Sequence, residues 1–262
     1  MHGFSSRATL TNGSNLAANT RSLQIGTDLE FEPGATGRCV LGLTGQYGNM
    51  GSTVTPTGSI GTINTSAYGI GFYATWYGND GTYVDAQSQV NRLSSDITSS
   101  TGGTLATGRT SMARAFSVEA GHRVIMGAES ALVPQVQLSW GGLNGGSFTD
   151  STGTSVNLGN SISRVARVGV AYEFARKGGS KFYAIGNVIH DFSGASSVTV
   201  GATTTSTALA NPVLAEIGFG GTWKFGKSEI YGEANLRQAL GGTGGTANNT
   251  SFGGTLGFRM KF

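Results

Sequence analysis

The chain has 262 residues, of which 44 are glycine, 4 are proline, 12% are charged and 38% are hydrophobic. Its formal net charge of +3 comes from 17 scattered Lys and Arg residues against 14 acids, which argues against nucleic-acid binding. Glycine, serine and threonine alternate with aromatic and aliphatic residues along the chain, which argues against simple disorder.

A membrane-spanning helix is not expected, because no run of about 18 apolar residues occurs. The mean hydropathy of −0.06 does not decide the compartment, because a membrane barrel hides its apolar band by alternating outward and inward residues. Cys39 is the single cysteine, so we expect no internal disulfide and no cysteine metal framework. No motif in the sequence indicates a cofactor, and none is expected.

Alternating hydrophobic and polar residues predict about twelve strands, each long enough for a tilted membrane crossing of roughly 9–11 residues. In chain order they span residues 4–11, 20–31, 38–50, 63–77, 82–95, 109–124, 129–141, 161–174, 181–192, 212–225, 228–239 and 251–262.

The last of these strands separates its two faces most sharply. Phe252, Leu256 and Phe258 share one parity, whereas Arg259 and Lys261 share the other. A basic side chain facing lipid near the midplane costs roughly 2–4 kcal/mol, so the aromatic parity is expected to face lipid.

The same interpretation assigns polar residues of the other strands to the lumen. The predicted pore-lining residues are Asp85, Gln87, Gln89, Glu119, Gln135, Gln137, Glu216, Glu233, Arg237 and Arg259. Aromatic residues near strand ends are predicted to form girdles at the membrane interfaces, namely Trp76, Trp140, Phe182, Tyr183 and Trp223.

The links between predicted strands alternate in length. Links 32–37, 78–81, 125–128, 175–180 and 226–227 are short, whereas 12–19, 51–62, 96–108, 142–160, 193–211 and 241–250 are mostly long and rich in Gly, Ser and Thr. This alternation is typical of an outer-membrane barrel with short periplasmic turns. The chain is therefore predicted to be all-β, with residues 1–262 forming one transmembrane antiparallel barrel whose termini are both periplasmic. A soluble β-sandwich is the structural alternative.

One motif matches the phosphate-binding pattern G-x-x-x-x-G-K-[ST], from Gly221 to Ser228. A phosphate-binding loop opens a helix, whereas alternation after Ser228 predicts a strand. We therefore interpret Gly226 and Lys227 as the tip of a turn.

A hydrolase using His190 is a further alternative, since a histidine near an outer strand end could act as a base. Asp191 follows it directly, and adjacent strand residues point to opposite faces, so Asp191 cannot orient His190 as a triad acid would. We expect His190 to be a polar interfacial residue and the protein not to be an enzyme.

Four stretches resemble strands of autotransporter β-domains, the C-terminal translocators of type V secretion. They are residues 68–78 (YGIGFYATWYG), 81–87 (GTYVDAQ), 116–122 (FSVEAGH) and 132–140 (LVPQVQLSW). The C-terminal residues Thr255, Gly257, Met260 and Phe262 also resemble the signal that outer-membrane proteins present to the β-barrel assembly machinery.

The resemblance implies a twelve-stranded barrel in the lipid of a Gram-negative outer membrane that carries its N-terminal passenger to the cell surface, with a linker helix in the lumen. Residues 1–19 lack helical periodicity, so passenger and helix are expected to be absent from this chain. We also expect a monomer. A small-solute channel is the alternative within the same fold.

Overall fold

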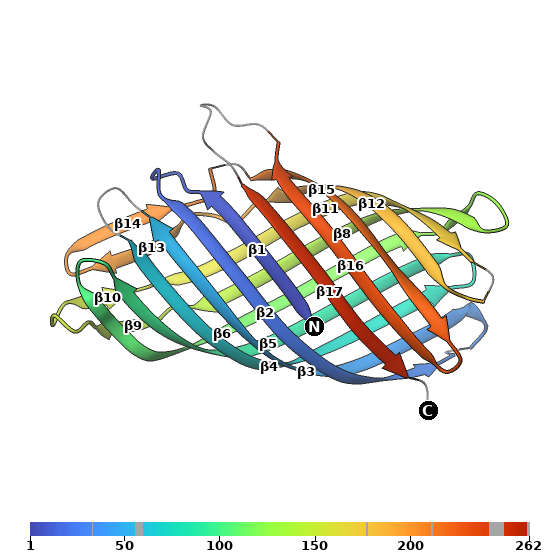
Figure 1. Ribbon diagram of the computed structural model, residues 1–262, viewed down its shortest axis with the longest axis horizontal. Coiled ribbons are helices and arrows are strands. Elements are labelled where there is room, and N and C mark those ends of the chain that lie inside the picture. Colours follow the sequence, from blue (N-terminus) through green and yellow to red (C-terminus); the bar gives the residue numbers. More distant parts are fainter. Residues whose placement is uncertain (33, 56–59, 177, 211, 241–248, 261–262) are drawn as a thin grey trace.

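Twelve long strands close into one antiparallel barrel in the computed structural model, which describes residues 1–262 except 33, 56–59, 177, 211, 241–248 and 261–262 (Figure 1). The barrel strands are β1 (His2–Thr9), β2 (Asn15–Phe31), β3 (Gly37–Thr55), β4 (Gly61–Gly78), β5 (Thr82–Ser99), β6 (Gly103–His122), β8 (Ser130–Asn144), β11 (Asn160–Ala175), β12 (Lys181–Asp191), β15 (Val213–Phe225), β16 (Ser228–Ala239) and β17 (Thr250–Met260). The shorter elements are η1 (Gly34–Thr36), β7 (Val124–Ile125), β9 (Ser147–Thr149), β10 (Ser155–Asn157), β13 (Ser196–Val200) and β14 (Thr203–Thr207).

Each barrel strand pairs antiparallel with the next one along the chain, and β1 pairs with β17 to close the cylinder. The register between first and last strands runs from His2 opposite Thr255 to Arg7 opposite Thr250. Closure removes the free edges that would otherwise leave backbone polar groups in lipid. The predicted fold class and strand number are confirmed.

Strands β2 to β6 reach further toward the long loops than predicted. β2 begins at Asn15, β3 continues to Thr55, and β5 and β6 are joined across residues 100–102 alone. These extensions are rich in Ser, Thr and Asn, so the sequence predicts them to be loops. They nevertheless pair in register, as Thr53 does with Thr62, because hydrogen bonding between strands does not require apolar side chains.

The two ends of the barrel differ. At one end, β9 and β10 between β8 and β11, together with β13 and β14 between β12 and β15, form a separate four-stranded sheet (Figure 1). At the other end, short turns join the strands. The link 226–227 is one of these turns, where Phe225 pairs with Ser228 and Gly226 adopts a φ of 63°. A strand follows Ser228, so the interpretation of the phosphate-loop motif as a turn is confirmed.

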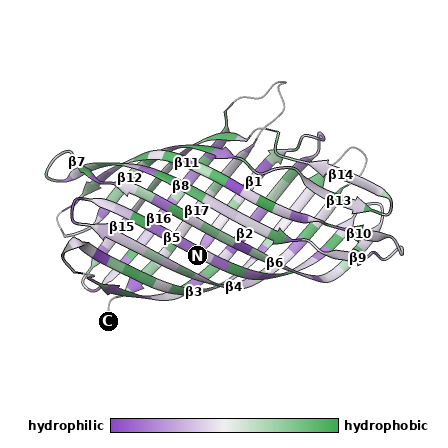
Figure 2. Ribbon diagram, turned by 180° about the vertical axis from the view of Figure 1, so that it is seen from behind, coloured by the Kyte–Doolittle hydropathy of each residue, from purple (hydrophilic) through white to green (hydrophobic). Residues whose placement is uncertain are grey.

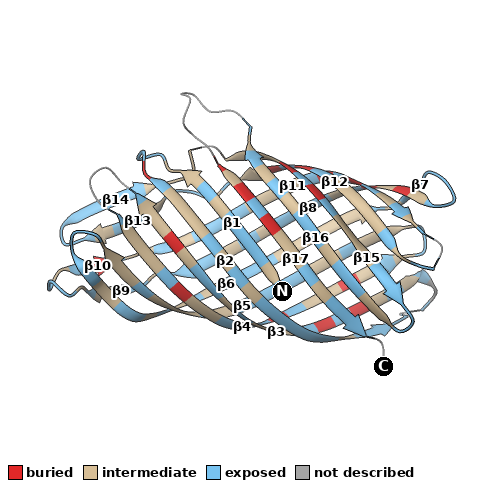
Figure 3. Cartoon of the chain, viewed as in Figure 1, coloured by how far each residue is buried: buried red, intermediate tan, exposed pale blue. Residues whose placement is uncertain are grey.

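Hydrophobic and hydrophilic residues alternate along the strands (Figure 2), and successive residues point to opposite faces of the barrel wall. Large hydrophobic side chains are widely exposed on one parity, including Ile25 at 71%, Phe219 at 62% and Phe258 at 61%. Few residues are buried, and those that are lie scattered through the wall (Figure 3). The fold therefore places its apolar surface outward rather than in a central core, as a membrane barrel does.

The chain's first residue lies part-way along the barrel, whereas β17 ends at Met260 near the turn between β15 and β16 (Figure 1). Met1 exchanges two backbone hydrogen bonds with Leu256, at 2.7 and 2.9 Å. No helix among the described residues is long and apolar enough to cross a membrane.

Candidate functional site: the polar inner face

Contacts between second-neighbour strands identify the concave face of the barrel. Tyr83 on β5 donates its hydroxyl to Glu119 on β6 at 2.6 Å and lies 2.9 Å from Gln135 Oε1 on β8, two strands away. Its ring crosses Gly121, where a Cβ would overlap the ring. Side chains converge across an intervening strand only on the inside of a curved sheet, so this face lines the lumen.

Glu119 is the centre of one inner cluster. Its second carboxylate oxygen accepts a hydrogen bond from Arg167 on β11, across β8. The two side chains are 16% and 20% exposed, so both are largely withdrawn from solvent. Gln137 lies opposite both residues in register, between their strands. One charge-assisted network thus joins β5, β6 and β11 through Tyr83, Glu119 and Arg167.

A second cluster surrounds Glu216, whose side chain is only 4% exposed. Arg237 on the neighbouring strand β16 donates from Nε to one carboxylate oxygen, and Asn187 on β12 donates to the other at 2.6 Å. A buried carboxylate needs such partners, because an unpaired charge in low dielectric is strongly unfavourable.

Two further inner clusters lie toward the short turns. Asp28 on β2 accepts hydrogen bonds from Arg259 on β17 and from the hydroxyl of Tyr73 on β4, the latter at 2.9 Å. Glu233 on β16 accepts from the hydroxyl of Tyr183 on β12, across β15. Tyr183 therefore points inward, and its predicted place in an aromatic girdle is wrong: its polar hydroxyl finds a lumen carboxylate over the bare backbone of Gly220.

Amides line the remaining wall between these clusters. Asp85 accepts hydrogen bonds from Thr75 at 2.6 Å and from Gln87 at 2.8 Å. Gln89 accepts one from Gln46 on β3 at 3.2 Å. Inward residues of this region are among those lining a cavity of about 250 Å³, namely Gln24, Thr44, Tyr73, Gln87, Gln89, Ser117 and Ser139.

The ten sequence-selected residues therefore share the inner face, but they fall into separate clusters rather than one constellation. Sequence reasoning missed Arg167, Asp28 and the hydroxyls of Tyr73 and Tyr183, which complete the networks. Strand parity was the available signal, since Arg167 alternates with outward Val168.

The C-terminal strand presents the residues selected as an assembly signal in different ways. Thr255 Oγ1 lies 3.0 Å from Nδ1 of His2. Gly257 lies beneath the ring of Tyr231, and Met260 is 47% exposed on the outward parity. Phe262 lies outside the described residues.

His190 shares its parity with outward Val188, which is 53% exposed. Its ring packs against Phe192 with the ring centroids 4.1 Å apart. Asp191, on the opposite parity, accepts the backbone N–H of Ser193 at 2.7 Å. Asp191 therefore does not orient His190, and the prediction from strand alternation is confirmed.

Comparison with known proteins decides the family. Residues 1–235 match the family model described as the autotransporter beta-domain. The chain belongs to the autotransporter β-domain family. The β-domains of this family are outer-membrane translocators of the passenger polypeptides fused to them, and this barrel is such a translocator.

Relatives and solved structures agree with this assignment. The autotransporter β-domain is 31% identical to the adhesin BmaC autotransporter of Brucella suis biovar 1 over 264 residues, covering 96% of this chain but 8% of the adhesin. The chain thus spans a small fraction of that relative's length.

Its fold resembles the transport unit of autotransporter AIDA-I from Escherichia coli, with a TM-score of 0.83, 19% identity, and coverage of 100% of this chain and 88% of that one. It also resembles the translocator domain of autotransporter NalP from Neisseria meningitidis, with a TM-score of 0.66 and 14% identity. The match covers 100% of this chain and 87% of the NalP chain.

Proposed function

We propose that a passenger fused N-terminally to this β-domain threads through the lumen as an extended hairpin, past Gln87, Gln89, Glu119, Gln135, Gln137 and Glu233. Asp85, Glu216, Arg237 and Arg259 line the same path. A twelve-stranded lumen is narrow, so the passenger crosses unfolded, and its folding outside supplies direction.

The observation that carries this proposal is the internal pairing of the lumen charges. Each of three inner carboxylates has an arginine partner in the wall: Arg167 with Glu119, Arg237 with Glu216, and Arg259 with Asp28. Paired charges offer few open hydrogen-bonding groups to a passing chain, which lets the chain slide without binding.

The orientation belongs to the same proposal. The short turns face the periplasm and the long-loop end faces outward, so both termini point to the periplasmic side. Thr255, Gly257, Met260 and Phe262 are recognised by the β-barrel assembly machinery. The domain acts as a monomer, since one chain closes the cylinder, and it performs no chemistry, since His190 faces outward beside Phe192.

Surface exposure of a tag tests export. A signal sequence, an epitope-tagged passenger and a helical linker are placed before residue 3, and protease is added to intact cells. We expect the tag to be removed. Protection of the tag in cells whose barrel is folded and inserted would contradict the proposal and favour a small-solute channel.

Two variants of β5 test the lumen path. Gln87→Trp/Gln89→Trp places bulky rings on the inner face beside the 250 Å³ cavity. Ser88→Trp places the same ring on the outward parity between Phe72 and Phe116. We expect tag exposure to fall several-fold in the first variant and to be unchanged in the second. Equal export by both would contradict a path along this wall.

A further inference from the structure

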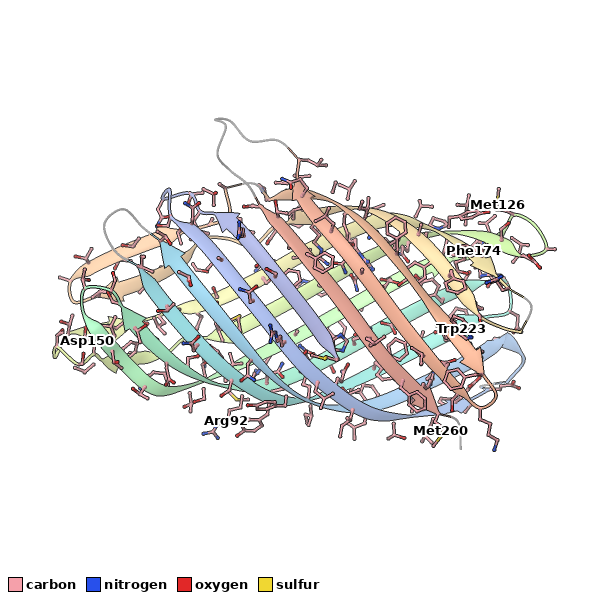
Figure 4. All side chains as sticks on the ribbon, viewed as in Figure 1. Arg92, Met126, Asp150, Phe174, Trp223 and Met260 are labelled. Atoms are coloured by element: carbon pink, nitrogen blue, oxygen red, sulfur yellow. The ribbon has the colours of Figure 1, made fainter. Side chains whose placement is uncertain are left out.

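Charged side chains are rare on the outward face of the barrel, yet three arginines gather there. Arg92 on β5, Arg114 on β6 and Arg164 on β11 are all exposed and share their parity with the exposed hydrophobic residues of their strands. Arg92 projects away from the barrel (Figure 4). We call these three residues the arginine triplet.

The strand register places Arg92 and Arg114 on adjacent strands and Arg164 one strand beyond β8. Arg92 lies opposite Met112, two residues from Arg114 on the same face. Arg114 lies opposite Gly142 on β8, and Arg164 lies opposite Trp140 on the other side of that strand. Arg92 and Arg114 are therefore diagonal neighbours, and such pairs on one face of a sheet lie about 7–8 Å apart, within reach of long side chains. Arg164 lies further away, because β8 separates it from Arg114 and its register is shifted by two residues.

The guanidinium groups of the triplet have no acidic partner. None of the three guanidinium groups takes part in an ion pair or a hydrogen bond in the part of the chain that the structure describes, and the backbone N–H of Arg164 donates to Ser193 Oγ at 3.1 Å. The acid nearest along β5, Asp96, lies four residues beyond Arg92 and accepts the backbone N–H of Gly108 at 2.8 Å. This contrasts with the inner face, where Arg167, Arg237 and Arg259 are all paired.

Exposed aromatic rings lie beside the triplet. Phe116 and Trp140 stack with centroids 5.8 Å apart, and the backbone N–H of Phe192 donates to the carbonyl of Arg164. The space above Gly142 is open, since a Cβ there would meet nothing within 4 Å. The patch therefore combines three cations with apolar surface and a free space between them.

The depth of the triplet indicates its ligand. Arg92 lies ten residues from the start of β5 at the short turns, and Arg164 eleven residues from the end of β11 there. Arg114 lies eight residues from the end of β6 at the short turns. A membrane crossing takes about 9–11 residues, so Arg92 and Arg164 lie at the interface near the long loops and Arg114 lies just inside it. An outward arginine costs about 2–4 kcal/mol at the midplane and about 0–1 kcal/mol near the interface.

We infer that the arginine triplet binds the phosphate groups of a phosphorylated glycolipid in the leaflet at the long-loop end, with the acyl chains lying along Phe116 and Trp140. Arginine forms bidentate, charge-assisted hydrogen bonds with phosphate oxygens. The inference rests on the orientation in the proposed function, because the short-turn leaflet carries different lipids.

Native mass spectrometry of the purified, detergent-solubilised barrel tests the inference, with doubly phosphorylated lipid A as the probe. We expect Arg92→Gln/Arg114→Gln/Arg164→Gln to bind lipid A at least tenfold more weakly than the wild type. Arg21→Gln is the matched control: Arg21 is an exposed outward arginine on β2, at a similar depth, and lies opposite Gly3 and Asn49. Its binding should change less than twofold.

Lipid comparisons decide the chemistry. Lipid A without phosphates should bind the wild type about as weakly as lipid A binds the triple variant, and phosphatidylglycerol should bind more weakly than lipid A. Equal binding of lipid A by the wild type and a folded triple variant would overturn the inference, as would equal binding of the dephosphorylated lipid. If the triple variant does not fold, the three single variants replace it.

The export assay is independent of this measurement. Loss of lipid A binding with normal surface exposure of the tag supports the glycolipid site and leaves the translocator intact. A wild-type barrel that binds lipid A but does not expose the tag would refute the proposed path of the passenger, not the lipid site.

Discussion

The ring of Tyr231 on β16 lies over Gly257 of β17, so that a Cβ at position 257 would overlap the ring. The pair recurs on the inner face, since Tyr73 covers Gly42, Tyr83 covers Gly121 and Tyr183 covers Gly220 in the same way. Each glycine lets a tyrosine lie flat across the neighbouring strand.

Gly257→Ala is therefore expected to slow barrel assembly and to destabilise the barrel by about 1–3 kcal/mol, because the added methyl group overpacks against the Tyr231 ring. The fraction of folded barrel on unheated gels during refolding measures the effect. Gly254→Ala on the same strand is the control, since its Cβ would meet only Glu233 O at 3.6 Å. Restoration of folding by Tyr231→Ala in the Gly257→Ala background would establish the overlap as the cause.

Glu119→Gln is expected to lower the free energy of unfolding by about 1–3 kcal/mol, because Arg167 and the hydroxyl of Tyr83 lose a charged acceptor in a largely enclosed cluster. Urea unfolding in micelles measures the change. Glu30→Gln removes the negative charge of the acceptor of Arg38 in a pair with side chains 42% and 47% exposed, and should cost no more than about 1 kcal/mol. Equal effects of the two substitutions would show that the inner network adds no stability.

The turn between β9 and β10 is expected to be pH-sensitive. Asp150 accepts hydrogen bonds from the backbone N–H and hydroxyl of Thr152 and from the N–H of Thr154, and these bonds hold the pKa of Asp150 below its usual value. Because the folded pKa is the lower one, the stabilisation is fully present above the usual aspartate pKa of about 3.9 and is lost as the pH falls through the folded pKa.

Carboxyl NMR titration of Asp150 checks this expectation, with the amide shifts of Thr152 and Thr154 following the same transition. In Thr152→Val, which removes the hydroxyl donor, the pKa should move back toward the usual value. A wild-type titration at the usual aspartate pKa would contradict the role of the turn.

Lys227→Ala should leave both folding and export unchanged, because Lys227 is the tip of a two-residue turn and not part of a phosphate site. Adenosine triphosphate should produce no shift in the thermal unfolding of the wild type. Gly226→Val, in contrast, should destabilise the hairpin by about 1–2 kcal/mol, since Gly226 has a φ of 63° that a β-branched residue adopts poorly. A thermal shift with the nucleotide that Lys227→Ala abolishes would reverse this interpretation.

The sequence by itself determined the strand number, the two faces of the strands with clear alternation and the approximate positions of the short turns. These features follow from the alternation of side chains along a strand, in which every second residue faces lipid and the residues between them face the lumen. The selection of Glu119, Glu216 and Glu233 for the inner face followed from parity alone. The interpretation of residues 221–228 as a hairpin rested on the same alternation.

Only the tertiary structure decided which inner residues meet. Arg167 reaches Glu119 across β8, and Tyr183 reaches Glu233 across β15, because barrel curvature brings second-neighbour strands within side-chain reach. The register also decides that the polar ends of β3 and β4 pair with each other. It decides, too, where Arg92, Arg114 and Arg164 lie relative to one another on the outward face. Register is a relation between two strands. The alternation within each strand excludes a shift by one residue, which would turn every side chain to the other face, but it does not distinguish shifts by two residues.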